Sequence, residues 1–342
     1  MKGIELARVF YQQIGEPVLR QRFPQYMDQI AAGLVGEGSE CFGFDDAISH
    51  DHDFGARFCL WLPDELYAEI GGQLQRAYEE LPDTFAGFPV IRERAAGGAR
   101  RSGVFAISEF YNRLLMRQPD NRFPDCSLEK VVLPASEEDW FTYRESALAV
   151  VTNGEVFADP AGHFTAVREK LCAYYPENVR LKKLAVSLMY MAQTGQVNYA
   201  RSMERGDTFA AGLCKTEFVR AALSTLYLLN RKYMPYYKWA GKGLENARVF
   251  TDGIVLLKKL QENRPQAAAW RTWKPGTPML NMQDENVKDI ETFCGRTAEE
   301  LRRQNLTDSG EVFLNPQGIQ VLRHITNREI LRQPVRMPEW MG

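Results

Sequence analysis

Glycine, serine and aspartate residues that could handle phosphate and metal gather in residues 36–55, GEGSECFGFDDAISHDHDFG, which contain four glycines and six carboxylates. Gly36 and Gly38 lack a Cβ, so their backbone N–H groups can approach a ligand closely, and Ser39 adds a hydroxyl. Such donors suit phosphate oxygens. After a spacer of eleven residues come Asp51 and Asp53, which share one face if the chain is extended there. Two carboxylates on one face can bind Mg²⁺ together with substrate phosphates.

The joint pattern in residues 36–55 is more specific than its parts, because G-x-G-S alone is typical of a turn and D-x-D alone of a polar surface. The calcium-loop pattern D-x-[DN]-x-[DN]-G-x₅-E and the phosphate-loop pattern G-x-x-x-x-G-K-[ST] are both absent. We therefore predict a phosphate and metal site. Arg57 has the parity of Asp51 and Asp53, so in a regular strand its guanidinium would reach the same side.

Short strands and helices must position these groups in the first part of the chain. The apolar run 31–36 predicts a buried strand that ends at the glycines, and the alternating, aromatic-rich residues 51–62 predict a second strand before Pro63. Further strands are expected over 88–94 and 102–107, and helices over 4–14, 17–30 and 64–81.

From about residue 136 the apolar spacing is helical, apart from a short strand candidate, GEVF, at 154–157. The fold class expected is α+β: an α/β domain with a small mixed sheet over residues 1–135, followed by an all-helical bundle over residues 136–342. Helices are expected over 162–173, 177–204, 208–231, 244–263, 283–304 and 316–331.

Composition favours an ordinary globular protein over a dedicated nucleic-acid binder. The 342 residues carry 42 Lys and Arg against 44 Asp and Glu, a formal net charge of −2. No signal-peptide pattern or bilayer-length apolar run is present, so we expect a cytoplasmic protein that does not bind membranes. The six cysteines have no C-x-x-C spacing, so they predict reduced thiols and no zinc site.

The segment GSECFGFDDAISHDHDFG resembles the signature of the nucleotidyltransferase (polymerase-β-like) superfamily, hG[GS], a spacer of about nine to thirteen residues, then Dh[DE]h. With the following residues ARFCLWL it is similar to DUF4037, a bacterial family of nucleotidyltransferase-like proteins. Three later stretches fit the same family and extend the resemblance over residues 25–240: GEVFADPAGHFTAVREKL, GQVNYARSMERGD and LLNRKYMPYYKW.

This resemblance implies a Mg²⁺-dependent nucleotidyltransferase that transfers a nucleoside monophosphate, AMP from ATP in the leading case, to a hydroxyl of a small molecule or protein. Gly38 and Ser39 would hold the triphosphate of ATP or another NTP. Asp51 and Asp53 would be the catalytic residues and would ligate two Mg²⁺ ions. The helical half resembles that of the kanamycin-type nucleotidyltransferases by architecture alone.

The third carboxylate that the superfamily usually supplies from a neighbouring strand is missing from residues 102–107. Glu109, Glu93 and Glu145 are candidates from nearby positions. Asp45 and Asp46 match the family pattern and leave two roles open: turn acids in solvent, or a further metal ligand, for which Asp46 is the candidate. The missing acid supports an alternative function, a weak or inactive nucleotide-binding or interaction protein with the same fold. A resistance-type enzyme that acts on an antibiotic is a third hypothesis.

Candidate nucleotide-binding residues in the helical half are Arg201, Arg205 and Lys238. The two arginines are four residues apart and share a helix face, so they could clamp an anion or simply form a solvated or internally paired surface. Lys238 lies among tyrosines and Trp239, where aromatic and cationic groups could hold a base and a phosphate, or could form part of the core at a helix end. The sequence does not determine the acceptor or the oligomeric state.

Overall fold

The chain forms two compact units in a computed structural model. The first unit comprises residues 1–134 and 143–174, and the second comprises residues 135–142 and 175–342. The division expected after residue 135 therefore needs a correction, because residues 143–174 belong to the first unit. The structure describes residues 1–46, 48–50, 54–92, 100–116, 133–271 and 280–334.

Residues 143–174 belong to the first unit because they contribute an edge strand and a covering helix to its sheet. Strand β6 (Glu155–Ala158) pairs antiparallel with β1 (Ala31–Leu34), with Leu34 opposite Glu155. In helix α6 (His163–Cys172), the Phe164 ring stacks on Trp61 at a centroid distance of 3.9 Å. Both contacts join segments more than 100 residues apart, so local sequence patterns do not reveal them.

The sheet of the first unit has four strands in the order β5-β2-β1-β6. Strand β2 (Cys59–Leu62) pairs antiparallel with β1 and parallel with β5 (Gly103–Ala106). All residues of β1, β2 and β5 are buried, as expected of apolar strands covered on both faces. The expected small mixed sheet is confirmed.

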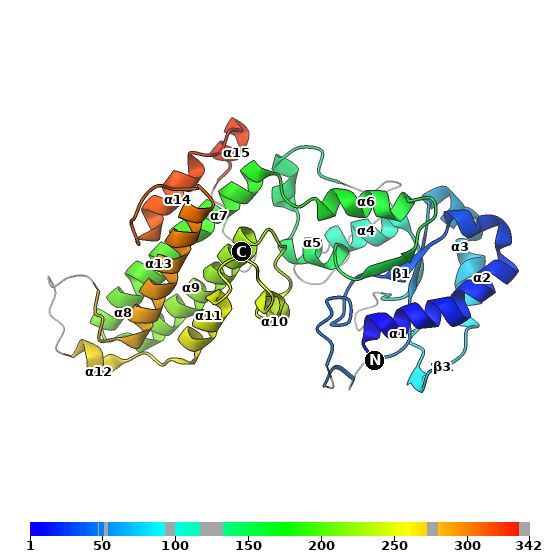
Figure 1. Ribbon diagram of the computed structural model, residues 1–342, viewed down its shortest axis with the longest axis horizontal. Coiled ribbons are helices and arrows are strands. Elements are labelled where there is room, and N and C mark those ends of the chain that lie inside the picture. The colour runs from blue at the N-terminus through cyan, green and yellow to red at the C-terminus, as the bar shows by residue number, and fades with distance from the viewer. Residues whose placement is uncertain (47, 51–53, 93–99, 117–132, 272–279, 335–342) are drawn as a thin grey trace. The chain divides into compact units, whose positions relative to one another are not determined.

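Side chains alternate between two covered faces of this sheet. On one face, the Phe58 ring lies 5.3 Å from Phe10 of α1 (Gly3–Phe10) and 5.0 Å from Tyr78 of α3 (Asp64–Glu79). On the other face, Trp61 packs against Phe164 and lies 5.3 Å from Phe110 of α4 (Ile107–Leu115). Helices therefore cover both faces of the sheet, as can be followed around β1 in Figure 1.

The strand expected over 51–62 is observed only over Cys59–Leu62. Before it, Ala56 forms an isolated parallel bridge with Val90, and a Cβ on Gly55 would lie 2.3 Å from the carbonyl oxygen of Pro89. This segment therefore pairs away from β1, and a regular strand does not extend back through Arg57. Residues 51–53 lie outside the described residues.

The second unit is built from helices packed side by side, which confirms the expected helical half and the α+β class. Helix α7 (Glu177–Met191) continues through a π-helical segment, η5 (Ala192–Tyr199), into α8 (Ala200–Glu204), and packs against α9 (Thr208–Leu229). Gly195 permits this packing, because a Cβ there would lie 2.3 Å from the Phe218 ring. Buried Arg180 donates to the carbonyl of Leu228 at the end of α9.

The remaining elements connect or cover these cores. Those of the first unit are η1 (Tyr11–Gly15), α2 (Glu16–Arg22), η2 (Pro24–Gln29), η3 (Ile48–His50), β3 (Thr84–Phe85), β4 (Phe88–Pro89) and α5 (Glu145–Val151). Those of the second unit are η4 (Glu138–Thr142), α10 (Tyr237–Ala240), η6 (Lys242–Leu244), α11 (Gly253–Glu262), α12 (Ala267–Trp270), α13 (Glu285–Arg303), α14 (Leu314–Leu322) and α15 (Arg328–Arg332).

Candidate phosphate and metal site

The chain leaves β1 through a turn that requires glycine at two positions. The φ angles of Gly36 and Gly38 are +130° and +136°, a region that residues with a Cβ rarely adopt. A Cβ on Gly38 would also lie 2.5 Å from either carboxylate oxygen of Glu40, whereas the space beside Gly36 is open. Gly36 and Gly38 were predicted to let backbone N–H groups approach a ligand. Their φ angles show that the turn itself also requires them. We call residues 36–43 the glycine turn.

The glycine turn is anchored by the residues that precede β6. The Gly36 amide donates to Asn153 Oδ1 at 3.0 Å, and Asn153 Nδ2 donates to the Gly36 carbonyl at 2.8 Å. The Gly154 amide donates to the Cys41 carbonyl at 2.7 Å. Sequence reasoning missed Asn153; its only local signal is an Asn-Gly pair before a strand. These bonds fix both ends of the turn to the sheet.

The turn leaves donors of Gly38 and Ser39 unused. Among the described residues, neither backbone N–H donates a hydrogen bond to any acceptor, and neither does the Ser39 hydroxyl. The Ser39 carbonyl accepts from the amides of Phe42 and Phe44, at 3.2 and 2.8 Å, so the peptide group beyond Ser39 is held in place. Two amides and a hydroxyl at one glycine turn are donors that phosphate oxygens can use.

Arg57, a predicted nucleotide ligand, is buried and paired with Glu40. The Arg57 side chain is 4% exposed, that of Glu40 is 12% exposed, and Arg57 Nη2 donates to Glu40 Oε1. Burial lowers the pKa of Arg57, but the negative charge of Glu40 opposes it, and the net pKa is raised. The guanidinium is therefore charged, and its charge is neutralised from within the glycine turn.

Asp45 and Asp46 both accept hydrogen bonds from backbone amides. Asp45 is 2% exposed; its Oδ2 accepts from the Gly3 amide at 2.8 Å, at the start of α1. Asp46 is exposed, and its Oδ1 accepts from the Ile48 amide and from the amide and hydroxyl of Ser49. The Ser49 hydrogen bonds lower the pKa of Asp46. Asp46 is thus an acid of a turn in solvent, whereas the same expectation is wrong for the buried Asp45; a metal role for Asp46 stays a prediction.

The predicted metal ligands Asp51 and Asp53 lie outside the described residues. Among the residues that are described, no three His, Cys, Asp or Glu side chains lie together in a group that could hold a metal ion. Strand β5 contains no acid, and Glu109 in α4 lies 3.8 Å from the Arg100 guanidinium. Glu93 is also outside the described residues. Glu145 is buried at the start of α5.

Arg201 and Arg205 in the second unit are exposed at the end of α8, as their spacing predicts. Arg205 Nη1 donates to the Arg201 carbonyl at 3.0 Å. Within the described part of the chain, neither guanidinium forms an ion pair, so the alternative of pairing with Glu204 is not observed. Asp207 accepts from the Ala210 amide and caps α9 as expected. The structure thus leaves both cations available to an anion.

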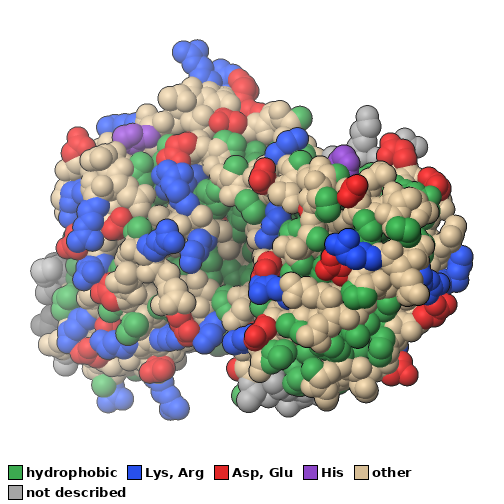
Figure 2. Space-filling view, turned by 45° about the vertical axis from the view of Figure 1, so that its right-hand side comes forward, with side chains coloured by type: hydrophobic (Ala, Val, Ile, Leu, Met, Phe, Trp, Pro, Cys, Tyr) green, Lys and Arg blue, Asp and Glu red, His purple; other side chains and the backbone are tan. Residues whose placement is uncertain are grey.

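Lys238 lies on α10, with its Nζ 5.0 Å from the centre of the Trp239 ring. The neighbouring Tyr236 and Tyr237 are 52% and 73% exposed, and their ring centroids are 4.1 Å apart. These tyrosines are therefore not core residues. On the molecular face in Figure 2, Lys and Arg side chains are interspersed with Asp and Glu side chains in both units. A ligand role for Lys238 stays a prediction.

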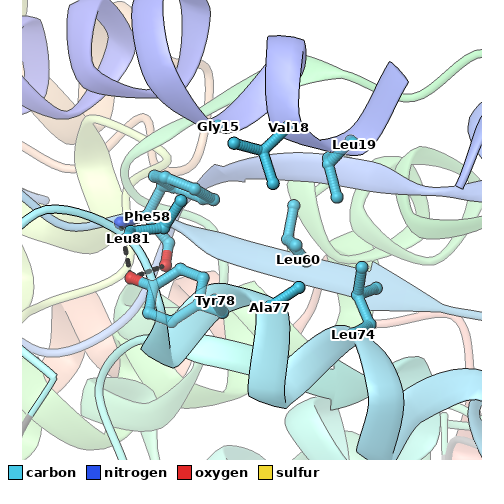
Figure 3. A pocket seen from close by; sticks show the side chains of 9 residues that line it. All are labelled: Gly15, Val18, Leu19, Phe58, Leu60, Leu74, Ala77, Tyr78 and Leu81. Atoms are coloured by element: carbon cyan, nitrogen blue, oxygen red, sulfur yellow. Dashed lines mark hydrogen bonds between the residues drawn. The ribbon is translucent and has the colours of Figure 1, made fainter. Parts of the chain in front are cut away.

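A small apolar pocket in the first unit lies between η1, α2 and α3 over β2, and Figure 3 shows its lining. The Tyr78 hydroxyl at its edge donates to the Phe58 carbonyl at 2.9 Å and accepts from the Phe58 amide at 3.3 Å. The cavity volume is about 10 Å³, room for about one water molecule. The residues that line it are Gly15, Val18, Leu19, Phe58, Leu60, Leu74, Ala77, Tyr78 and Leu81.

Comparison with known proteins identifies a family for part of the chain. The sequence model described as "Domain of unknown function (DUF4037)" matches residues 140–240. Residues 140–240 carry a DUF4037 domain. The resemblance stated for the sequence is confirmed for this segment, which includes Arg201, Arg205 and Lys238. No curated protein is significantly similar to the chain.

Among solved structures, a nucleotidyltransferase-like protein from Exiguobacterium sibiricum 255-15, determined at 1.90 Å resolution, is 11% identical to the chain. The alignment covers 86% of this chain and 81% of that one, with a TM-score of 0.33. A TM-score of this size does not establish a shared fold. No helix in the described part of the chain is long and apolar enough to span a bilayer.

Proposed function

We propose that this DUF4037 protein is a nucleotidyltransferase that binds an NTP, ATP in the leading case, through the glycine turn and transfers its nucleoside monophosphate to a hydroxyl. The observation that carries this proposal is the pair of unused amides at Gly38 and Ser39, in a turn that follows a central strand. The acceptor is a small molecule or a protein side chain.

The glycine turn would bind phosphate oxygens in a geometry fixed before the ligand arrives. Asn153 holds Gly36 from both its amide and its carbonyl side, so the amides of Gly38 and Ser39 need little reorganisation. The Ser39 hydroxyl would donate to a further phosphate oxygen. Because Gly38 carries no Cβ, the ligand can reach the peptide N–H directly.

Asp51 and Asp53 would hold the Mg²⁺ ions, which neutralise phosphate charge and align the reacting groups when bound. The Asp46 carboxylate has one oxygen, Oδ2, that is not used by the capping hydrogen bonds of Ile48 and Ser49. That oxygen would complete the ligand set. Arg201, Arg205 and Lys238 are proposed, independently of the glycine turn, as nucleotide-binding cations of the second unit.

Incubating the protein with each labelled NTP, Mg²⁺ and a metabolite pool tests this function. We expect release of pyrophosphate that requires Mg²⁺ and is abolished by Asp51→Asn and strongly reduced by Ser39→Ala. The matched control is Asp28→Asn, which removes an exposed carboxylate of η2 and is expected to leave turnover unchanged. Pyrophosphate release that Asp51→Asn does not affect would contradict the proposal.

A second function, nucleotide binding without turnover, is supported by the absence of a carboxylate from β5, the strand parallel to β2. In that case the protein binds an NTP but releases no pyrophosphate, and Asp51→Asn leaves nucleotide affinity unchanged. Absence of both binding and release would contradict both functions.

A further inference from the structure

The Glu40 side chain fills the space that two glycines leave at the glycine turn. A Cβ on Gly38 would lie 2.5 Å from either carboxylate oxygen of Glu40, and a Cβ on Gly3 would lie 2.5 Å from Glu40 Cβ. The carboxylate thus lies directly against the peptide unit whose amide is unused. Contacts with Gly3 at the start of α1 and with Gly38 hold it there, beside the buried guanidinium of Arg57.

Arg57 has more hydrogen-bond donors than its observed contacts use. A guanidinium carries five N–H donors, and Nη2 of Arg57 donates to Glu40. Its Nη1 is buried and has no acceptor among the described residues. A buried donor without an acceptor costs free energy, so this one calls for a physical reason. With Glu40 in place, Arg57 Nη1 and the amides of Gly38 and Ser39 still donate no hydrogen bond among the described residues.

We propose that the Glu40 carboxylate is the internal occupant of an oxyanion site formed by Arg57 and the glycine turn, and that a phosphoryl group binds by replacing Glu40 on Arg57. Carboxylates and phosphoryl groups both accept the parallel N–H groups of a guanidinium. A terminal phosphoryl group has three oxygens, so it can take Arg57 and still reach the turn amides. Glu40 then competes with the ligand and sets its affinity.

The choice of a phosphoryl ligand rests on the proposed function, but the exchange on Arg57 does not require turnover. Inorganic pyrophosphate is a suitable probe because it carries two terminal phosphoryl groups and no base or sugar. Binding of pyrophosphate is measured by isothermal titration calorimetry on the full chain, in chelator and without divalent ions. Under these conditions the affinity reports the contacts of the protein alone.

Glu40→Gln keeps the shape of the side chain and removes its charge, so we expect pyrophosphate to bind about tenfold more tightly than to the wild type. The gain is expected to disappear in the double variant Glu40→Gln/Arg57→Gln. The matched control is Glu16→Gln, which removes the carboxylate from an exposed arginine pair, Glu16–Arg20 at 2.6 Å, and changes net charge equally. That control should leave pyrophosphate affinity unchanged.

The inference is overturned if Glu40→Gln binds no more tightly, if the gain survives in the double variant, or if Glu16→Gln produces the same gain. The exchange on Arg57 and the proposed enzymatic function can fail independently of each other. A gain in pyrophosphate affinity without NTP turnover supports the exchange on Arg57 and contradicts the nucleotidyltransferase function. Turnover that depends on Asp51, without a gain in pyrophosphate affinity in Glu40→Gln, supports the nucleotidyltransferase function and contradicts the exchange on Arg57.

Circular dichroism melts establish whether each variant folds, and a measurement on the wild type covers the case where Glu40→Gln does not. Amide hydrogen exchange at Gly38 and Ser39 is followed while pyrophosphate is raised to its solubility limit. Slower exchange at both amides, together with loss of this protection in Arg57→Lys, supports the site. Unchanged exchange, or protection that Arg57→Lys retains in full, overturns it.

Discussion

The glycine turn of the first unit is held by hydrogen bonds from a distant segment, whereas the candidate cations of the second unit are exposed and contact only near neighbours. Gly36 is held by Asn153, which lies 117 positions along the chain. Arg205 instead donates to the carbonyl four residues before it, and Lys238 lies over the adjacent Trp239 ring. A fixed site can orient a small anion, while exposed cations supply charge with little orientation. The glycine turn thus has the geometry to position an anion, and the helical unit offers exposed positive charge.

Replacing an arginine in each unit should give the largest contrast. We expect Arg57→Ala to lower the free energy of unfolding of the first unit by about 4 kcal/mol, because it leaves Glu40 as an unpaired, mostly buried charge. Arg201→Ala removes an exposed guanidinium without an ion pair in the described structure and should cost less than about 0.5 kcal/mol. Urea denaturation followed by fluorescence measures both. Equal losses would remove the distinction between the two regions.

Alanine substitutions at Gly36 and Gly38 test whether the Glu40 side chain is held as firmly as the backbone of the glycine turn. Gly36→Ala should cost about 2 kcal/mol from its positive φ alone, since the space beside it is open. Gly38→Ala should cost about 1 kcal/mol more, because its methyl group would displace the Glu40 carboxylate from Arg57. Urea denaturation of both variants gives the difference. If Gly36→Ala is the more costly, Glu40 is not held as firmly as the contacts indicate.

The elements that sequence could predict are those with a local signature. The apolar run of β1, the CLWL of β2 and the Gly-x-Gly turn were recognisable because side-chain period and glycine type act within a few residues. The α+β class follows from the change to helical spacing. The N-terminal cap of α9 is also local, because the Asp207 side chain accepts from the Ala210 amide, three residues along the chain.

What sequence could not predict depends on partners far along the chain. The strand GEVF was expected, but its pairing with β1, which draws residues 143–174 into the first unit, needs a register across more than 100 residues. The same holds for Asn153 on Gly36. The parity argument for Arg57 needs a regular strand, which is observed only from Cys59, because Gly55 and Ala56 meet Pro89 and Val90 instead of β1.

A smaller loss in the free energy of unfolding is expected when the hydrogen bonds of Asn153 to the glycine turn are removed. Asn153→Ala removes both hydrogen bonds to Gly36, and because the site is partly buried we expect a loss of about 1–2 kcal/mol in the free energy of unfolding. Amide exchange at Gly38 and Ser39 should also accelerate. The control is Asn198→Ala in η5, where the amide of Gln193 makes one exposed side-chain contact at 3.1 Å. A larger loss at Asn198 would reverse the comparison.

The smallest effect expected is a difference in salt sensitivity between two exposed carboxyl groups, Asp46 beside the glycine turn and Glu245 in the helical unit. The pKa of Asp46 is lowered first by the hydrogen bonds of Ser49, and the pKa of Glu245 is lowered first by its hydrogen bond and ion pair with Lys242. An exposed contact between opposite charges, such as Lys242 with Glu245, is screened at about 1 M salt, where the Debye length is about 3 Å, while hydrogen bonds from the uncharged amide and hydroxyl of Ser49 depend little on salt. NMR titration should therefore show the pKa of Glu245 rising towards its ordinary value with salt, and that of Asp46 staying low.

The sign of the pH dependence follows from both shifts being downward. Each carboxylate stabilises the folded state above its unfolded pKa, and this contribution is lost as the pH falls through the lower pKa of the folded state. Ser49→Ala should raise the pKa of Asp46 in low and high salt alike, and Lys242→Ala should raise that of Glu245 only in low salt. If the pKa of Asp46 rises with salt as that of Glu245 does, exposed charge rather than hydrogen bonding from Ser49 lowers the pKa of Asp46, and the two carboxyl groups do not differ in kind.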